Sequence, residues 1–372
     1  MTVPFNAHLE SLTPYPPGKP IEEVKRELGL EQVVKLASNE NPLGPSPRAL
    51  EALRAAAGEL HLYPDGNIHA LRVAVAKHLG VEPEWLIFGN GSDEVLMIAG
   101  LTFLGPGTNL VMSKHGFIRP MQHATLAGAE TKVIDVIPRH CEQDAEGMAF
   151  AINAKTRMVY LANPNNPTGD LVYADRVHGL IEAVPQDCLM VLDEAYHEYC
   201  VGAEDYQDSI QWLSEFPNLL VTRTFSKAYG LAGLRCGYGV GHPDLIRAME
   251  RVRPPFNVSR AVQVAALAAL DDQEHVERAV EVNRIGVAQV LAGLEDLPAD
   301  PTPSRGNFLL VDVRCLSQPI FEAMLRRGVI TRPMAGYGLP QCLRISIGTE
   351  AENALMLEAL GASLAERVGV AR

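Results

Sequence analysis

The 372-residue sequence lacks several features that would point to particular classes of protein. Its six cysteines include no CxxC pair, which argues against a disulfide framework or a zinc site and favours reduced thiols. No apolar run reaches the roughly 18 residues that a membrane-spanning helix needs. The first 20 residues contain prolines and no apolar signal-peptide core. We therefore expect a cytoplasmic protein that does not enter a membrane.

Positive charge is also scarce, because 45 acidic residues outnumber 32 lysines and arginines and give a formal net charge of −13. This balance argues against nucleic acid as the main partner, since a phosphate backbone needs a basic surface. It does not exclude small anionic substrates, because a few local arginines can override the average field. The apolar content of 47% is that of an ordinary globular protein, and the length suits two domains.

Short apolar segments alternate with segments of helical spacing through the middle of the chain. The expected strands are residues 109–112, 132–137, 158–161, 189–192, 219–224 and 237–240. This alternation predicts an α/β fold with a mostly parallel sheet that is covered by helices on both faces. In such sheets ligands bind beyond the carboxyl ends of the strands.

A second, smaller α/β unit is expected toward the carboxyl terminus. Residues 259–270 are predicted to form a helix capped by Ser259, and a longer helical pattern runs from 271 to about 297. Beyond Pro301 the pattern changes to expected strands at 307–313, 329–332 and 343–347. The proline-rich amino-terminal segment is expected to lie over a surface of this chain or of a partner.

The most informative segment is TFSKAYGLAGLR, residues 224–235. It places Lys227 between an expected strand and a glycine-rich run, with Ser226 beside it and Arg235 eight positions on. A lysine held in a cleft supplies an amine that can form an imine with an aldehyde cofactor, and the serine and arginine suit a phosphate. The alternative is a lysine on the surface, and two upstream motifs decide between these interpretations.

The two motifs are NPNNPTG at 163–169 and DEAY at 193–196. Asp193 ends an apolar run, and a buried carboxylate there needs a partner such as a pyridinium N–H. Asn166 and Tyr196 are candidate donors to a phenolic oxygen, where they would lower the pKa of an imine. Taken separately, Asp193 also suits a helix N-cap or a metal ligand, and the NPNNPTG segment suits a tight turn.

A phosphate site is expected at GNGSDE, residues 89–94, which precede an apolar helical stretch. A helix that starts at such a segment offers free N–H groups and the positive end of its dipole to an anion, although a simple capping turn is the alternative. Together these groups meet the needs of pyridoxal 5′-phosphate, namely an amine, an acid for the ring nitrogen, donors to the phenolic oxygen and an anion cradle. The GxGxG run at 237–241 lacks the spacing of a dinucleotide fingerprint, and the histidines form no convincing metal set.

These motifs occur in order with several others. The others are SNENP at 38–42, GPSP at 44–47, YPD at 63–65, Asn307-Phe308, Arg332 and LRISIGTEAEN at 343–353. In this combination the chain resembles the fold-type-I pyridoxal-phosphate aminotransferases over nearly its whole length, most closely their histidinol-phosphate branch. The resemblance implies a large domain with a mostly parallel seven-stranded sheet flanked by helices, and a smaller C-terminal α/β domain. It places an arm that joins the small domain and a dimer interface at 1–45, the large cofactor-binding domain at 46–270 and the small domain at 271–372.

The resemblance also implies roles for single residues. Lys227 is similar to the catalytic lysine that binds the cofactor and moves a proton, and Asp193 would face the ring nitrogen. Asn166 and Tyr196 would meet the phenolic oxygen, and Phe117 would stack on the ring where many members have tyrosine. The implied phosphate set is Gly91, Ser92, Asp93, Ser226 and Arg235, joined by Tyr63 from the neighbouring subunit of a homodimer. Thr224 is also expected to bind the cofactor.

For the substrate, Arg344 is similar to the arginine that takes the substrate carboxylate in the wider family. In the histidinol-phosphate branch Arg332 and Tyr15 would meet the substrate's phosphate, and Asn39 would also bind substrate. The implied reaction exchanges an amino group between L-histidinol phosphate and 2-oxoglutarate, giving imidazole-acetol phosphate and L-glutamate, a step of histidine biosynthesis.

Two phenylalanines keep a different substrate open. Phe117 and Phe256, the second within PPFNVS where many members have Pro-Tyr-Asn, also suit an aminotransferase for phenylalanine or tyrosine. Less favoured alternatives are a decarboxylase of an amino-acid phosphate and a pyridoxal-phosphate-binding regulator without catalysis. The regulator would need a basic DNA-binding segment, which the sequence lacks.

Overall fold

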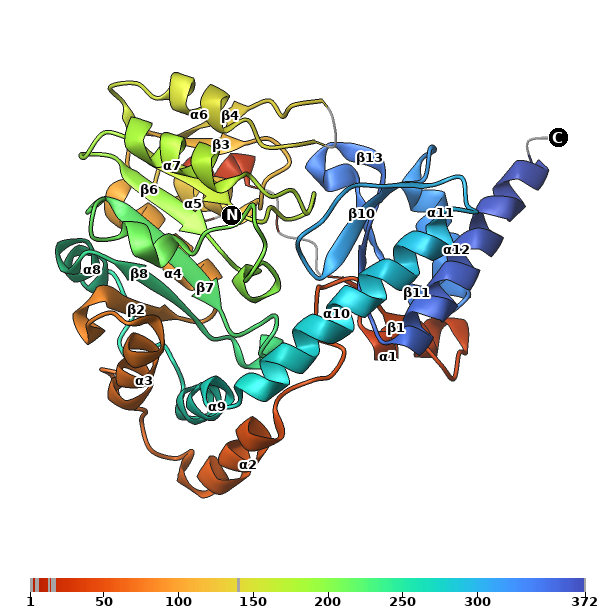
Figure 1. Ribbon diagram of the computed structural model, residues 1–372, viewed down its shortest axis with the longest axis horizontal. Coiled ribbons are helices and arrows are strands. Elements are labelled where there is room, and N and C mark those ends of the chain that lie inside the picture. Colours follow the sequence, from red (N-terminus) through yellow and green to blue (C-terminus); the bar gives the residue numbers. More distant parts are fainter. Residues whose placement is uncertain (1–2, 4–6, 13, 15–17, 139–140, 371–372) are drawn as a thin grey trace.

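The structure is a computed structural model that describes residues 3, 7–12, 14, 18–138 and 141–370, without the side chains of 367–370. Its main element is a seven-stranded sheet with the order β2-β8-β7-β6-β5-β3-β4 (Figure 1). The strands are β2 (Leu86–Gly89), β3 (Asn109–Ser113), β4 (Glu130–Ile134), β5 (Thr156–Ala162), β6 (Leu189–Asp193), β7 (Leu219–Thr224) and β8 (Gly237–Gly241). All neighbours are parallel except those of β8, which is antiparallel to both β2 and β7.

Helices cover both faces of this sheet, which explains why its central strands are almost continuously apolar. One face packs against α4 (Ser92–Phe103), α5 (Arg119–Leu126) and α8 (Pro243–Glu250). The other packs against α2 (Pro47–Ala56), α3 (His69–Leu79), α6 (Ala145–Ala151), α7 (Ala174–Ala183) and α9 (Arg260–Leu270). Each face has its own cluster of buried side chains, so the sheet is the shared middle layer of a three-layer unit.

The smaller unit is built on a four-stranded antiparallel sheet with the order β12-β13-β10-β9. Its strands are β9 (Asp300–Pro301), β10 (Phe308–Asp312), β12 (Arg332–Met334) and β13 (Leu339–Ser346). The helices α11 (Ser317–Arg326) and α12 (Glu350–Val370) pack beside this sheet around a separate apolar cluster (Figure 1). Near the amino terminus, α1 (Ile21–Leu28) precedes β1 (Val34–Lys35), which pairs in parallel with β11 (Val329–Ile330). The segment before the large sheet therefore joins the smaller unit.

The 22-residue helix α10 (Gln273–Leu294) connects the two units (Figure 1). Val276, near its start, belongs to a core cluster of the large unit. Val290 and Leu294, near its end, belong to the core cluster of the small unit. One continuous helix therefore contributes to both cores.

β8 is rich in glycine because α4 approaches it closely. A Cβ atom on Gly237 would lie 2.2 Å from the backbone nitrogen of Ser92, the first residue of α4, and no real contact is that short. The GxGxG run thus allows the amino terminus of α4 to pack against the sheet. That terminus is where the sequence predicts a phosphate site.

The six strands expected in the large sheet are all present, although β4 begins two residues before the expected segment 132–137 and ends three residues before its limit. Ser259 caps α9 by accepting a hydrogen bond from the backbone nitrogen of Val262, as predicted. β2 was not predicted, since its four residues are too few to show a period. Among the described residues, no helix combines the length and apolar character needed to span a bilayer.

Candidate active site

Three neighbouring parallel strands end at the same edge of the large sheet. β5 leads into the turn that carries Asn166, β6 ends at Asp193, and β7 leads into the loop that carries Ser226 and Lys227. Strand order alone therefore gathers three motifs whose named residues, from Asn166 to Lys227, lie up to 61 positions apart in the sequence. The amino terminus of α4 lies beside them, because α4 packs on β2, β7 and β8.

A cavity of about 130 Å³ lies at this edge. It is lined by Ser92, Asp93, Phe117, Ala162, Pro164, Asn166, Asp193, Ala195, Tyr196, Thr224, Ser226, Lys227 and Arg235. Ten of these thirteen residues were singled out from the sequence. The separate signals of an amine, an acid, amide and phenol donors and an anion cradle thus meet in one place.

Lys227 is partly buried in this cavity. Its Nζ donates to the carbonyl oxygen of Ser38 at 3.3 Å and lies 5.7 Å from the centre of the Tyr196 ring. Burial, followed by the positive charge of Arg344, lowers the pKa of this amine to about 7. A considerable fraction is therefore unprotonated at neutral pH, which a nucleophile toward a carbonyl carbon requires.

Asp193 is buried at the end of β6, and both of its carboxylate oxygens accept hydrogen bonds from hydroxyl groups. Tyr160 donates to Oδ2 at 2.8 Å and Thr222 donates to Oδ1 at 2.9 Å. Burial raises the pKa of Asp193 to about 6, while the two hydrogen bonds act in the opposite direction. The carboxylate can thus be an anion at neutral pH, where it would suit a cationic ring nitrogen.

Tyr160 and Thr222 were not expected from the sequence. The signal that could have found them is the sheet register, in which Asp193 pairs with Ala162 on one side and with Thr222 on the other. Tyr160 precedes Ala162 by two residues, so all three polar side chains lie on the same face of the sheet.

Tyr196 and Asn166 are held by residues from the amino-terminal segment and the smaller unit. Asn39 Nδ2 donates to the Tyr196 hydroxyl at 2.9 Å, and Arg344 Nη1 donates to Asn166 Oδ1 at 2.6 Å. With its oxygen engaged by Arg344, Asn166 has its amide N–H groups to offer a phenolic oxygen. Burial raises the pKa of Tyr196 to about 12, so its hydroxyl keeps its proton at neutral pH.

The anion cradle is formed by Arg235, Ser226 and the first turn of α4. Arg235 Nη1 donates to Ser226 Oγ at 3.2 Å, and Nη2 donates to the carbonyl oxygen of Asn90 at 3.5 Å. Gly91, the N-cap of α4, has a φ of +80°, and a Cβ atom there would lie 2.5 Å from Arg235 Nη2. A guanidinium, a hydroxyl and a helix amino terminus around one point fit a phosphate group.

The side chains of two predicted cofactor-binding residues already have hydrogen-bond partners within the protein. The Asp93 carboxylate accepts hydrogen bonds from Arg119 Nε at 2.8 Å and from His123 Nε2 at 3.1 Å. Although burial opposes the charge, these bonds lower the pKa of Asp93. The Thr224 hydroxyl donates to the carbonyl oxygen of Cys236 at 3.1 Å. Asp93 can therefore serve an anion with its backbone N–H but not with its carboxylate.

Two further predicted site residues, Tyr63 and Arg332, are not among those that line the cavity, and a third lies outside the described structure. The Tyr63 side chain is 81% exposed, and its ring centroid lies 5.0 Å from that of Phe256. Arg332 on β12 pairs across the small sheet with Arg344 on β13. Tyr15 lies outside the described residues. The expected roles of Tyr63, Arg332 and Tyr15 remain predictions.

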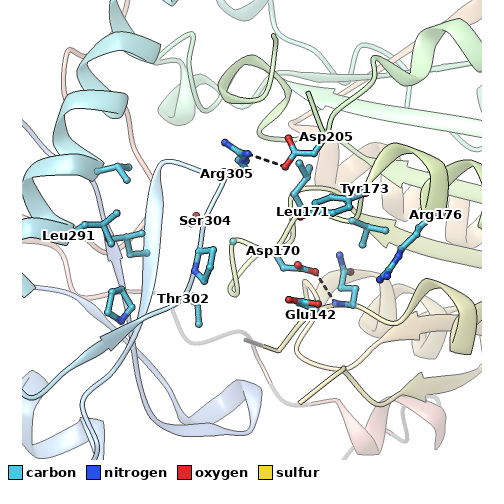
Figure 2. Close-up of a pocket in the computed structure, with 17 residues that line it drawn as sticks. Glu142, Asp170, Leu171, Tyr173, Arg176, Asp205, Leu291, Thr302, Ser304 and Arg305 are labelled. Carbon is cyan, nitrogen blue, oxygen red and sulfur yellow. Dashed lines mark hydrogen bonds and ion pairs between the residues drawn. The ribbon is translucent and has the colours of Figure 1, made fainter. Parts of the chain in front are cut away.

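A second, larger cavity of about 780 Å³ lies between the two units (Figure 2). Gly169, the last residue of the NPNNPTG turn, is part of its lining. Asp170 and Glu142 face Thr302 and Ser304 across it in Figure 2. Burial raises the pKa of Asp170 to about 6. The described residues that line it include acids and arginines but no lysine. We therefore place the chemistry in the smaller cavity, which holds the amine and the phosphate cradle.

Glu194, the neighbour of Asp193, lies on the opposite face of the sheet. Its carboxylate accepts hydrogen bonds from Arg223 at 2.7 Å and from Ser209 at 2.6 Å. His197 and Asp208 lie close enough to form a metal-like group with it, but the Arg223 guanidinium provides the positive charge there and also pairs with Asp208. This buried ion pair supports the loop after β6 and does not reach the cavity.

Residues 31–360 match the family model for aminotransferases of class I and II, and the chain therefore belongs to this family. It is 46% identical over 360 residues to histidinol-phosphate aminotransferase 1 of Nitrosococcus oceani, with 97% of this chain and 96% of the relative covered. It is 47% identical over 357 residues to histidinol-phosphate aminotransferase of Halalkalibacterium halodurans, with 96% of each chain covered.

Among solved structures, the chain is similar to histidinol-phosphate aminotransferase of Sinorhizobium meliloti in complex with pyridoxal 5′-phosphate. The TM-score is 0.89 at 31% identity, and the alignment covers 99% of both chains. Aspartate aminotransferase of Thermus thermophilus has the same fold, with a TM-score of 0.81 at 23% identity. The fold predicted from the sequence, that of the fold-type-I pyridoxal-phosphate-dependent transferases, is confirmed.

Proposed function

We propose that the chain catalyses pyridoxal-phosphate-dependent transamination between L-histidinol phosphate and 2-oxoglutarate. The observation that carries the reaction class is the presence of Lys227, Asp193 and the Arg235–Ser226 cradle in one cavity. Nearly full-length relatives that are 43–47% identical and carry the name histidinol-phosphate aminotransferase support the substrate. The products would be imidazole-acetol phosphate and L-glutamate.

Each polar residue of the cavity would have a separate role in the reaction. The bound cofactor supplies the electron sink that makes the substrate Cα acidic. Asp193 would hold the proton on the ring nitrogen, and Asn166 and Tyr196 would hold the phenolic oxygen. Lys227 Nζ would take the proton from the substrate Cα and deliver it to C4′ of the cofactor. Its pKa of about 7 suits both steps.

Arginines on the small sheet would bind the anionic ends of the substrates. Arg344 is buried beside the cavity, and Arg332 is its cross-strand neighbour. A guanidinium binds a carboxylate or a phosphate through two parallel N–H bonds, so the same region can serve glutamate and histidinol phosphate in turn. Tyr15 and Asn39 would complete this substrate set.

We also propose that the active unit is a homodimer in the cytoplasm. Leu60, Leu62, Tyr63 and Phe256 leave a large part of their apolar surface exposed, as an interface residue does before its partner binds. Tyr63 would then reach the phosphate of the neighbouring site. The six free cysteines support a reducing compartment. Sedimentation at micromolar concentration tests the dimer, and a monomer that is fully active would contradict it.

The proposal is tested by a spectral titration of the purified protein with pyridoxal 5′-phosphate. We expect a visible absorbance band that glutamate removes and that imidazole-acetol phosphate restores. A protein that develops no such band contradicts the proposal.

The ratio of kcat/KM for histidinol phosphate and phenylalanine distinguishes the proposed substrate from the aromatic alternative, for which Phe117 in the cavity lining is the supporting observation. Release of carbon dioxide would indicate a decarboxylase instead. Cofactor binding without any turnover would indicate a regulator.

The domain division at residues 45 and 270 is likewise a proposal. The pairing of β1 with β11 supports an arm that belongs to the small unit. The later part of α10, which contributes Val290 and Leu294 to the core of the small unit, supports assigning this helix to the small domain. Limited proteolysis, with fragments identified by mass, would locate the segments that open most easily.

A further inference from the structure

We propose that Tyr160 and Thr222 are positioning residues of this enzyme, whose hydroxyls orient the Asp193 carboxylate toward the cofactor's ring nitrogen and keep it an anion. This inference rests on the proposed function, because it assigns a role in binding the same cofactor. It concerns two residues that are not among those lining the cavity.

The hydrogen-bond geometry of Asp193 is the first argument. Each carboxylate oxygen accepts one hydroxyl hydrogen bond, from Tyr160 at 2.8 Å and from Thr222 at 2.9 Å. A carboxylate oxygen can accept about two hydrogen bonds, so each oxygen keeps acceptor capacity. Asp193 lines the cavity, and the ring nitrogen of a bound cofactor would use this capacity. Two fixed donors on different strands leave the carboxylate little freedom to rotate.

The burial of Tyr160 is the second argument. Its side chain is 2% exposed within an apolar cluster that includes Val191 and Leu220. A phenylalanine would fill this space without placing a hydroxyl in an apolar surrounding, which is costly unless the hydroxyl is hydrogen-bonded. Burial and the charge of Asp193 raise the pKa of Tyr160 well above its ordinary value, so the hydroxyl stays a donor at every relevant pH.

The charges around Asp193 explain why donors are needed. Asp93 and Glu194 are both acidic and act against a negative charge at Asp193, as does burial itself. Lys227 is the cation that faces it from the loop after β7, but its own pKa of about 7 leaves that charge incomplete at neutral pH. Tyr160 and Thr222 provide hydrogen bonds that do not depend on pH in this range. Without them the carboxylate becomes the stronger base, and the proton of the ring nitrogen moves to an Asp193 oxygen.

The test compares Tyr160→Phe and Thr222→Val with Tyr238→Phe. Tyr238 lies on β8 of the same sheet, is 4% exposed and contacts Arg223, so its variant controls for the loss of a buried phenol hydroxyl. Thr222→Ser keeps a hydroxyl and serves as the conservative partner of Thr222→Val. Folding of each apoprotein is first checked by circular dichroism.

Two readouts do not require turnover. The first is the dissociation constant of pyridoxal 5′-phosphate between pH 5 and 8. The second is the ¹⁵N chemical shift of bound cofactor labelled at its ring nitrogen, which reports whether that nitrogen carries a proton.

For Tyr160→Phe we expect the acid limb of cofactor binding to move up by about one pH unit, as the loss of one hydrogen bond to a charged group implies. We also expect the ¹⁵N shift to move toward the unprotonated value and kcat to fall by about 10–100-fold. Tyr238→Phe and Thr222→Ser should behave like the wild type in all three measurements, and Thr222→Val should move in the same direction as Tyr160→Phe.

The inference is overturned if Tyr160→Phe matches Tyr238→Phe in both the acid limb and the ¹⁵N shift. If Tyr160→Phe does not fold, the pair Thr222→Val and Thr222→Ser decides, and equal behaviour of that pair overturns it. A wild-type protein that binds no cofactor would contradict the proposed function itself and this inference with it. Normal wild-type turnover with unchanged variants would contradict the inference alone.

Discussion

Arg344 on β13 donates a hydrogen bond of 2.6 Å from Nη1 to Oδ1 of Asn166, in the turn after β5. A second bond runs from its Nη2 to the carbonyl oxygen of Ala37, also at 2.6 Å. The proposed substrate arginine is thus attached to the proposed donor for the phenolic oxygen. A substrate carboxylate that binds Arg344 must either share the guanidinium with Asn166 or displace the Asn166 oxygen from it. Substrate binding is therefore coupled to the direction of the Asn166 amide.

Replacement of the two small-sheet arginines should separate their roles. We expect Arg344→Ala to lower kcat/KM for glutamate by about 10–100-fold or more, since hydrogen bonds to a charged partner are lost. Arg344→Lys should recover only part of this, because an ammonium cannot form the two-bond fork. Arg332→Ala should affect histidinol phosphate more than glutamate. Equal losses for both substrates in both variants would instead indicate a single shared anion site.

Removal of the proposed catalytic amine should abolish the reaction while leaving the fold intact. We expect Lys227→Ala to lose at least the about 10²–10⁴-fold that a positioned acid–base group contributes, together with the visible band of bound cofactor. Lys114→Ala is the matched control, because that lysine is half-exposed and pairs with Asp135 at 2.7 Å on the surface. Steady-state assays and absorbance spectra measure both variants. Wild-type turnover in Lys227→Ala would contradict the assignment.

Asp193 should make the stability of the apoprotein depend on pH. Burial raises its pKa from 3.8 to about 6, so the folded protein binds more protons than the unfolded chain between these values. The free energy of unfolding of the wild type therefore falls as the pH rises through this window. Asparagine does not titrate, so the variant lacks this contribution to the fall. We expect the free energy of unfolding of Asp193→Asn to be higher than that of the wild type by on the order of 2–3 kcal/mol at pH 8. At pH 4 the difference should be under about 1 kcal/mol.

Urea unfolding of the cofactor-free proteins at pH 4, 6 and 8 measures this difference. Asp187→Asn removes one negative charge from a side chain that is 73% exposed, and should change stability by no more than about 0.5 kcal/mol. A difference for Asp193→Asn that stays constant with pH would show that the carboxylate does not titrate in this window.

Gly169 should be intolerant of a side chain, because it lies where the two units meet. Its φ is +78°, and a Cβ atom would lie 2.3 Å from Ser304 Oγ and 3.0 Å from the Ser304 Cα. We expect Gly169→Ala to destabilise the protein by about 1–3 kcal/mol and to weaken cofactor binding through the neighbouring Asn166. Gly179→Ala lies in α7 with no atom within 4 Å of the new Cβ, and should stabilise by about 0.4–1 kcal/mol. Thermal unfolding measures both variants, and the shift of Tm should be negative for Gly169→Ala and positive for Gly179→Ala.

The sequence was sufficient to predict six of the seven strands of the large sheet and most residues of the cavity lining, because these depend on local patterns. Strand ends carry Asp193, Ser226 and Lys227, and the parallel order of β5, β6 and β7 brings them together without any knowledge of the packing. Gly89 and Gly91 likewise indicated the start of α4, because glycines before an apolar helical stretch are a local signal. Predictions of this kind need only a strand, its end and the residue that follows it.

Other features depend on contacts between distant residues and could not be read from the sequence. Tyr160 seemed part of an apolar strand until the register placed it on the same face as Asp193. Asp93 was expected near the phosphate, but the sequence did not indicate that its carboxylate binds Arg119 and His123, 26 and 30 residues further on. Glu194 had no assigned role, because its partner Arg223 belongs to another strand. In each case the partner is chosen by the tertiary fold.

The helix α10, which enters one core at Val276 and another at Val290 and Leu294, makes the two units inseparable in a practical sense. A fragment that stops at residue 270 would leave the first core without Val276. A fragment that starts there would expose the front half of the helix to water. Neither half is a self-sufficient building block, so thermal melting should proceed as one transition and not as two. A chimaera that combines the large unit of this chain with the small unit of a relative should fold only when the whole of α10 comes from the same protein as the small unit.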